Sequence, residues 1–217
     1  MIRIALTKGR IETESLKLLS RAGYDCSSLS EENKGRKLLF RLGDENVEMV
    51  LAKAADVITY VEHGVCDAGI VGKDTIMEHG KSFYELLDLG FGKCRFALAG
   101  PKGKNFYEGY GRKIVASKYP GGAKAYFNGR GVDVEVVKIE GSVELAPLLG
   151  LAGAIVDIVE TGSTLKANGL EVYENIADVS ARLIVNVAAM KMKKAELDSL
   201  IGRMSAALPA RGEETEC

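Results

Sequence analysis

The sequence contains few of the residues that build metal centres and disulfide scaffolds. Its 217 residues include two histidines and four cysteines, and no two cysteines stand at CxxC spacing. His63 and His79 are well separated and have no ligand-type partners close by in the sequence, which argues against a transition-metal site. The irregular spacing of the cysteines is typical of reduced thiols in the cytoplasm. The four are Cys26, Cys66, Cys94 and Cys217.

The chain also lacks a strong charge of one sign and a long apolar run. Its net charge is −1, so no global basic field draws it to nucleic acid or to anionic lipid. The longest apolar stretch, residues 145–156, contains Pro147 and is too short to cross a bilayer. Lys8 and Arg10 interrupt the apolar N-terminus, which argues against a secretion signal. We therefore expect no nucleic acid and no membrane among the partners, and any anion site must be built locally.

Segments rich in isoleucine and valine alternate with helical patterns along the chain. The expected strands are 2–6, 37–42, 47–51, 68–71, 94–99, 114–117, 132–139, 154–159 and 181–189. Strands 37–42 and 47–51 are expected to form a hairpin across residues 43–46. The expected helices are 11–22, 54–63, 76–79, 121–129, 144–151 with Ser142 as its N-cap, and a final one that carries Leu197, Leu200, Ile201, Met204 and Leu208. Strand 94–99 alternates as a half-buried strand does, and strand 154–159 has the composition of a strand buried on both faces.

This alternation predicts an α/β fold of open sheets with right-handed crossovers. The flexible segment Gly90-Phe91-Gly92 predicts a division into two lobes. Lobe I would combine residues 1–90 with about 175–217, and lobe II would span about 91–174. Ligands of open α/β sheets bind at the carboxyl ends of strands, so a cleft between the lobes is the expected binding place.

The segment that follows the expected strand 154–159 has the chemistry of a sugar-phosphate site. Thr161-Gly162-Ser163-Thr164 offers small side chains, three hydroxyls and closely spaced backbone N–H groups, which suit a phosphate monoester. Asp157 and Glu160 stand beside it and suit sugar hydroxyls or a bound Mg²⁺. The alternative interpretation is a helix N-terminus without a ligand. Two carboxylates beside a buried strand end favour the functional one, because they repel each other unless a cation or sugar bridges them.

Three further candidate clusters lie directly after expected strands or at the starts of expected helices. Lys8-Gly9-Arg10 places two cations around a glycine, which suits a pyrophosphate or triphosphate. Residues 67–74, which end at Asp74, and residues 140–147, which include Glu144, are weaker candidates. Each cluster also has a purely structural interpretation, namely a solvated turn, a tight strand–helix turn or a capped helix start.

Residues 141–170, GSVELAPLLGLAGAIVDIVETGSTLKANGL, resemble the signature of the ATP phosphoribosyltransferases. Four shorter segments match the same family in order, and the resemblance extends from residue 1 to about 205. They are TKGR at 7–10, DAGIVGKD at 67–74, GKCRFALAGP at 92–101 and SARLIVNVAA at 180–189.

The resemblance implies a two-lobed fold similar to type II periplasmic binding proteins. It implies transfer of the phosphoribosyl group of 5-phosphoribosyl 1-pyrophosphate (PRPP) to N1 of ATP, with release of pyrophosphate and with Mg²⁺ brought by the substrate. Thr161, Gly162, Ser163 and Thr164 would hold the 5-phosphate, and Asp157 and Glu160 would face the ribose hydroxyls. Lys8 and Arg10 would be the catalytic cations. Together with Gly9, they would lie near the pyrophosphate or the ATP phosphates. Asp74 and Glu144 would be weaker contributors.

One position departs from the family pattern. Many members carry an Arg-Pro pair where this sequence has Lys53-Ala54, and lysine keeps the charge but loses the bidentate fork. The length of the chain resembles the short form of the family. That form implies a partner subunit that resembles a histidyl-tRNA synthetase and carries histidine feedback inhibition, in a hetero-octamer.

Other functions fit parts of the same pattern. A two-lobed anion- or solute-binding module without catalysis would share the architecture, since fold does not fix function. A phosphoribosyltransferase acting on a free base would use a similar phosphate loop, commonly with paired acids directly before it, whereas Ile158-Val159 separates them here. A regulatory effector domain would need a DNA-binding segment, and none precedes residue 1.

Overall fold

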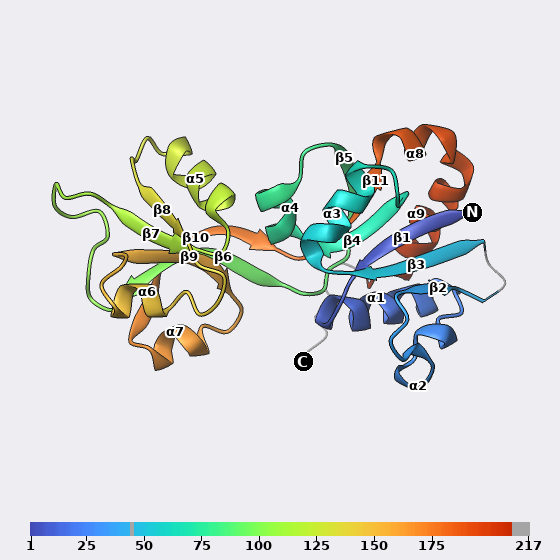
Figure 1. The fold of residues 1–217 in the computed structure, drawn as a ribbon, viewed down its shortest axis with the longest axis horizontal. Coiled ribbons are helices and arrows are strands. Elements are labelled where there is room, and N and C mark those ends of the chain that lie inside the picture. Colours follow the sequence, from blue (N-terminus) through green and yellow to red (C-terminus); the bar gives the residue numbers. More distant parts are fainter. Residues whose placement is uncertain (44–45, 210–217) are drawn as a thin grey trace. The chain divides into compact units, whose positions relative to one another are not determined.

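The computed structural model describes residues 1–43 and 46–209 (Figure 1). It divides the chain into two compact units. One combines Met1–Gly92 with the chain from Ser180 onward, and the other is Lys93–Val179. Each unit contains one open sheet covered by helices, so the predicted α/β class with two lobes is confirmed. Residues 44–45 of the expected hairpin turn and Cys217 lie outside the described residues.

The first unit is built on a six-stranded mixed sheet with the order β2-β3-β1-β4-β11-β5. Its strands are β1 (Ile2–Thr7), β2 (Leu39–Arg41), β3 (Val47–Ala52), β4 (Ala68–Gly72), β5 (Phe83–Asp88) and β11 (Ala181–Asn186). Strand β1 pairs in parallel with both β3 and β4. Strand β11 pairs antiparallel with β4 and β5, and β2 pairs antiparallel with β3. The predicted hairpin of β2 and β3 is therefore confirmed.

Side-chain alternation along β1 divides the core of this unit into two layers. Ile4 and Leu6 pack with residues of α1 and α9, whereas Ala5 packs with α3 on the other face. The helices are α1 (Arg10–Arg21), α2 (Glu31–Lys34), α3 (Ala54–Glu62), α4 (Lys73–His79), α8 (Val187–Met192) and α9 (Lys194–Ala207), with a 3-10 turn at Ser27–Leu29. A β-carbon at Gly69 would lie 2.8 Å from the side chain of Val57, so the glycine lets α3 approach β4 closely.

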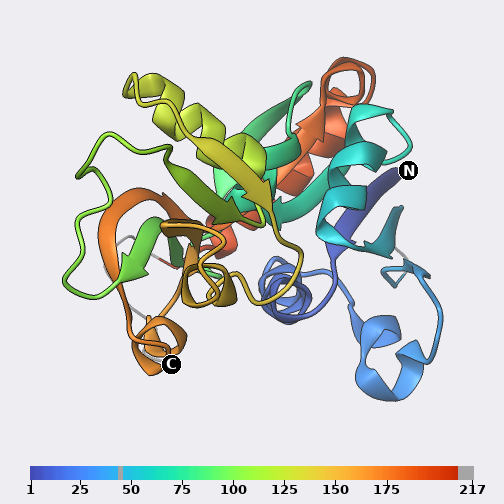
Figure 2. The same cartoon turned by 60° about the vertical axis from the view of Figure 1, so that its left-hand side comes forward.

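The second unit is built on a five-stranded sheet with the order β10-β6-β9-β7-β8. The strands are β6 (Cys94–Pro101), β7 (Ile114–Ser117), β8 (Glu135–Lys138), β9 (Ala154–Val159) and β10 (Leu170–Val179), and the helices are α5 (Pro120–Gly129), α6 (Leu145–Leu148) and α7 (Ser163–Ala167). Strands β9, β7 and β8 run parallel, and β6 is antiparallel to β9 and β10. Helix α5 covers one face of this sheet, and α6 and α7 cover the other (Figures 1 and 2).

Several expected elements differ in the structure. Strand β6 lies between β10 and β9. Phe96 and Ala97, which point to opposite faces, are both buried, so the half-buried assignment was wrong. Strand β9 is parallel to β7 but antiparallel to β6. The N-cap of α6 is Glu144 rather than Ser142, and α6 is shorter than predicted. Strands β5 and β10 were not predicted.

Strand β11 ends three residues earlier than expected because Asn186 starts a helix. The Oδ1 of Asn186 accepts the N–H of Ala189 at 2.9 Å, which caps α8. Its Nδ2 donates to the carbonyl of Val61 at 2.7 Å and so joins β11 to the end of α3. An asparagine at the end of an apolar strand was the signal for this boundary. Among the described residues, no helix combines the length and the apolar character needed to cross a membrane.

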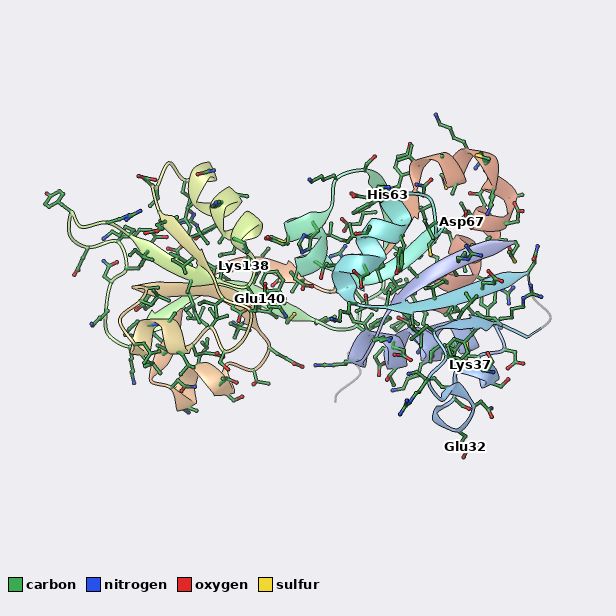
Figure 3. All side chains as sticks on the ribbon, viewed as in Figure 1. Glu32, Lys37, His63, Asp67, Lys138 and Glu140 are labelled. Carbon is green, nitrogen blue, oxygen red and sulfur yellow. The ribbon has the colours of Figure 1, made fainter. Side chains whose placement is uncertain are left out.

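The buried carboxylate of Asp67 ties the C-terminal helices to the first strand. Its Oδ2 accepts the N–H of Arg3 and the ammonium of Lys193, each at 2.8 Å. Lys193, at the junction of α8 and α9, also donates to the carbonyl of Met1 at 2.9 Å. Asp67 precedes β4 and lies inside the first unit, as Figure 3 shows.

Asp67→Ala is expected to destabilise the protein by about 2 kcal/mol, because two donors lose a buried acceptor. The matched control is Asp198→Ala, which breaks the exposed pair with Lys194 on α9 and should cost less than about 0.5 kcal/mol. Urea unfolding measures both. Equal transition midpoints for the two variants would contradict the role of Asp67.

Candidate functional site

Three parallel strands of the first unit end at the same edge. Strand β1 pairs with β3 up to Thr7 opposite Ala52, and with β4 up to Leu6 opposite Ile70. The residues that follow these strands are therefore neighbours at the carboxyl edge of the sheet. The structure brings these predicted site residues to that edge: Lys8, Gly9, Arg10, Lys53 and Asp74.

The turn between β1 and α1 is fixed from both sides. The hydroxyl of Thr7 donates to the carbonyl of Ile70 at 2.9 Å, and the N–H of Lys8 donates to Ala52 at 3.0 Å. Gly9 has φ 92° and ψ −139°, a conformation that a residue with a β-carbon rarely adopts.

The backbone N–H of Gly9 is already hydrogen-bonded to the buried carboxylate of Glu12. Its Oε2 accepts this N–H at 3.2 Å, and its Oε1 pairs with Lys34. Lys8 and Arg10 are exposed on either side of the glycine. The groups that this turn offers to an anion are therefore the two cationic side chains, rather than the amide of Gly9.

Lys53 and Asp74 lie at the N-termini of the neighbouring helices α3 and α4. Lys53 is exposed, and its carbonyl accepts the N–H of Val57 at the start of α3. Asp74 lies in the first turn of α4, where its Oδ2 accepts the hydroxyl of Thr75 at 3.2 Å. A β-carbon at Gly72 would overlap Oδ1 of Asp74, so the glycine makes room for this carboxylate against the backbone.

The second unit repeats this arrangement with three other parallel strands. Strands β9, β7 and β8 end at Val159, Ser117 and Lys138. The predicted phosphate loop follows β9, and Glu144 follows β8 at the start of α6. The structure therefore places these predicted residues after parallel strands at one edge: Glu144, Glu160, Thr161, Gly162, Ser163 and Thr164, with Asp157 on β9 itself.

The loop after β9 presents its hydroxyls to solvent. Gly162 adopts the left-handed conformation, with φ 75° and ψ 7°, and α7 begins at the next residue. The hydroxyl oxygens of Thr161 and Ser163 are 2.9 Å apart, and the N–H of Ser163 donates to Thr161 Oγ1 at 3.3 Å. Thr161, Ser163 and Thr164 are exposed, while Leu165 is buried and anchors the turn. The loop can therefore offer several donors to one anion.

Carboxylates accompany this loop. Asp157 is half-buried, and its Oδ1 accepts the N–H of Ile158 at 2.8 Å, whereas Glu160 is exposed. Glu140, just after β8, pairs with Lys138 at 2.6 Å, and both lie close together in Figure 3. The hydrogen bond from Lys138 holds the pKa of Glu140 below its usual value. Among the described residues, no three histidine, cysteine or acidic side chains are grouped closely enough to hold a metal ion.

A charged network beside the edge of the first unit was not predicted. Lys73, next to Asp74, pairs with Glu85 at 2.5 Å, and Arg182 on β11 pairs with Glu85 at 3.4 Å and Asp88 at 2.9 Å. The Oδ1 of Asp88 also accepts the hydroxyl of Ser180 at 2.7 Å and the N–H of Gly90 at 3.0 Å. The signal available in the sequence was Arg182, a charge inside an otherwise apolar strand.

A cavity of about 540 Å³ lies at the opposite edge of the second sheet. Its lining includes Tyr110, Lys113, Lys124 and Asp133, near the amino-terminal ends of β7 and β8. None of the predicted site residues lines it. The candidate site is therefore defined by the strand ends, and this cavity is not part of it.

Comparisons with known proteins find similarities over most of the chain. The family model described as "ATP phosphoribosyltransferase" matches residues 53–206. The ATP phosphoribosyltransferase of Clostridium kluyveri is 63% identical over 203 residues, which are 94% of this chain and 92% of that protein. The loop Thr161–Thr164 lies within the matched region.

Two solved structures are also similar. One is the ATP phosphoribosyl transferase HisG:HisZ complex of Thermotoga maritima, with 31% identity, a TM-score of 0.80 and coverage of 96% of this chain and 98% of that chain. The other is the periplasmic aliphatic sulphonate binding protein SsuA of Escherichia coli, with 11% identity, a TM-score of 0.56 and coverage of 95% and 72%. At that identity, the second likeness concerns the fold alone.

Gly9→Ala is expected to destabilise the protein by about 1–3 kcal/mol, because alanine is strained at the backbone angles of Gly9. The control is Gly202→Ala in the exposed part of α9, where a β-carbon meets open space. That variant should stabilise the protein by about 0.5–1 kcal/mol. Urea unfolding measures both, and a shift of the same sign for the two variants would contradict the assignment at Gly9.

Proposed function

Since the chain belongs to the ATP phosphoribosyltransferase family, we propose that its two strand edges carry that family's reaction. The enzyme transfers the phosphoribosyl group of PRPP to N1 of ATP and releases pyrophosphate, which is the first step of histidine biosynthesis. The observation that supports the assignment of the site is the loop after β9, where exposed hydroxyls stand directly beside Asp157 and Glu160.

We assign the PRPP sugar phosphate to this loop. Thr161, Ser163 and Thr164 donate through their hydroxyls and backbone to the 5-phosphate, and Gly162 gives the turn its shape. Each hydrogen bond to a charged acceptor contributes roughly 1.5–3 kcal/mol, so these donors determine the affinity. Asp157 and Glu160 accept the ribose hydroxyls and orient the ring. The exposure of the three hydroxyls supports these roles.

The chemical step is a displacement at the anomeric carbon with inversion. The bond from C1 to the pyrophosphate oxygen breaks, and a bond from C1 to N1 of ATP forms. Because N1 of the purine is a neutral nucleophile, no strong general base is required. The transition state has oxocarbenium character, and catalysis depends on positioning and on stabilising the leaving pyrophosphate.

Lys8 and Arg10 are the residues that we assign to the leaving group. Both are exposed beside Gly9, and their charges favour a pyrophosphate or the ATP phosphates. Lys53 provides a further cation as a point charge without a bidentate fork. Gly9, Lys53, Asp74 and Glu144 are weaker assignments for ATP or pyrophosphate.

The reaction uses a divalent metal, and we assign Mg²⁺ to it. Mg²⁺ is commonly held by one or two carboxylates together with substrate phosphates, and Asp157 and Glu160 provide such oxygens beside the loop. When bound, the ion neutralises charge that develops on the pyrophosphate.

The chain works with a regulatory subunit of the kind present in the T. maritima complex. It covers 98% of the chain solved there together with HisZ. We propose that this partner resembles a histidyl-tRNA synthetase, carries the response to histidine and joins the chain in a hetero-octamer. We also propose a cytoplasmic location, which is supported by the lack of a disulfide at Cys26, Cys66 and Cys94.

A solute-binding module without catalysis is the alternative that the fold alone would allow. The likeness to SsuA is limited to 11% identity, whereas the transferase of C. kluyveri is 63% identical over most of the chain. Family membership therefore favours the enzyme.

Incubation of the chain and its regulatory subunit with ATP, PRPP and Mg²⁺ should yield N1-phosphoribosyl-ATP and pyrophosphate. The first is followed by its absorbance and the second by a coupled assay. Histidine should inhibit the complex and have little effect on the isolated chain. Binding of PRPP without release of pyrophosphate would contradict the proposed function, and strong inhibition of the isolated chain would contradict the role of the partner.

Thr161→Val and Thr164→Val should each raise the KM for PRPP roughly tenfold or more, since each removes a donor to a charged acceptor. The KM for ATP and the thermal midpoint should change little. Thr59→Val on the exposed side of α3 is the matched control, and it should leave both KM values unchanged. Wild-type PRPP kinetics in both loop variants would refute the assignment of the loop.

A further inference from the structure

We propose that Lys118 is a further PRPP-binding residue, which contacts the phosphoryl oxygens of the sugar phosphate held by the loop Thr161–Thr164. This inference depends on the proposed function, and it adds a cation that the sequence patterns did not single out. Its support is the position of Lys118 in the sheet, the rigidity of its backbone and the charges around it.

The topology of the sheet places Lys118 beside the phosphate loop. Strand β7 lies between β9 and β8, and Ser117, its last residue, pairs with Val156 on one side and Lys138 on the other. Strand β9 continues for three residues beyond Val156, to Val159. In a parallel register, Lys118 therefore stands level with Asp157, just before the loop begins.

The backbone on both sides of Lys118 is held by buried groups. Ser117 is fully buried, and its hydroxyl donates to the carbonyl of Val156 at 2.6 Å and accepts the N–H of Tyr119 at 2.8 Å. The N–H of Ile139 donates to the carbonyl of Ser117 at 3.0 Å. The ring of Tyr119 stacks edge-on against Phe96, with centroids 5.7 Å apart. Lys118 is thus an exposed side chain on a fixed base, as a ligand-binding residue requires.

The charges around the loop create the need for a cation at this edge. Residues 157–164 contain two carboxylates and no lysine or arginine, while PRPP carries several negative charges. Lys138 is already paired with Glu140 at 2.6 Å. Lys118 also acts on Glu140, whose pKa is lowered first by the hydrogen bond from Lys138 and, to a smaller extent, by the charge of Lys118. A lysine at this point offsets the acids that would otherwise repel the phosphates.

A simpler role for Lys118 would be to neutralise Asp157 and Glu140 without contact to substrate. The two roles differ in what they predict. If Lys118 only neutralised these acids, its loss would lower the stability of the protein and would change the affinity for every ligand equally. A binding role would make the loss specific to PRPP.

Lys118→Met tests the inference by isothermal titration of the full chain with PRPP in Mg²⁺, and separately with ATP. The dissociation constant for PRPP should rise roughly tenfold or more, and its salt dependence should become weaker, because one charge-assisted contact is lost. The ATP affinity and the unfolding midpoint should stay at wild-type values. Lys118→Arg keeps the charge and should restore most of the PRPP affinity.

Lys124→Met is the matched control, because Lys124 is an exposed lysine of α5 in the same unit, at the opposite edge of the sheet. It should bind PRPP as the wild type does. Wild-type PRPP affinity in Lys118→Met, together with weak binding in Thr161→Val, would overturn the inference and leave the proposed function intact. Equal losses for PRPP and ATP with a lower unfolding midpoint would also overturn it. Failure of the wild type to bind PRPP would overturn both.

Discussion

Parallel pairing of short strands is the constraint on which the candidate site depends. In the first unit it aligns the ends of β1, β3 and β4, and in the second unit the ends of β9, β7 and β8. Residues that are far apart in sequence thereby become neighbours at one edge of each sheet. Cations dominate the first edge, and hydroxyls with acids dominate the second. The first edge therefore offers cations for phosphates, and the second offers hydroxyls and carboxylates for a sugar phosphate.

The sequence predicted those parts that local patterns encode. Apolar runs such as the one that became β9 are visible without knowledge of their partners, and the Thr-Gly-Ser-Thr turn is a compact chemical signal. Gly162 adopts the left-handed conformation and the residues that carry the hydroxyls are exposed, while the binding role of the turn stays a prediction. Roles taken from the family resemblance, such as those of Lys8 and Arg10, remain proposals because their contacts would be with substrate.

Features that depend on distant partners were outside the reach of local patterns. Strand β10 is mostly half-exposed and carries polar residues, and its pairing with β6 provides the regular structure that its composition does not indicate. The carboxylate of Glu12 at Gly9 and the hydroxyl of Ser117 between two strands are visible only once the chain has folded. Lys118 was missed for the same reason, since strand order made it a neighbour of the loop.

The pairing of β6 with β10 has a consequence for how the chain could be divided. Cys94 and Val179, almost the first and last residues of the second unit, are opposite each other in this pair. In the first unit, the N–H of Ala181 donates to the carbonyl of Phe91 at 2.9 Å, so the two points of attachment are also adjacent there. The second unit is therefore a continuous insert whose ends meet. A short linker from Gly92 to Ser180 would therefore bridge the gap left by its excision.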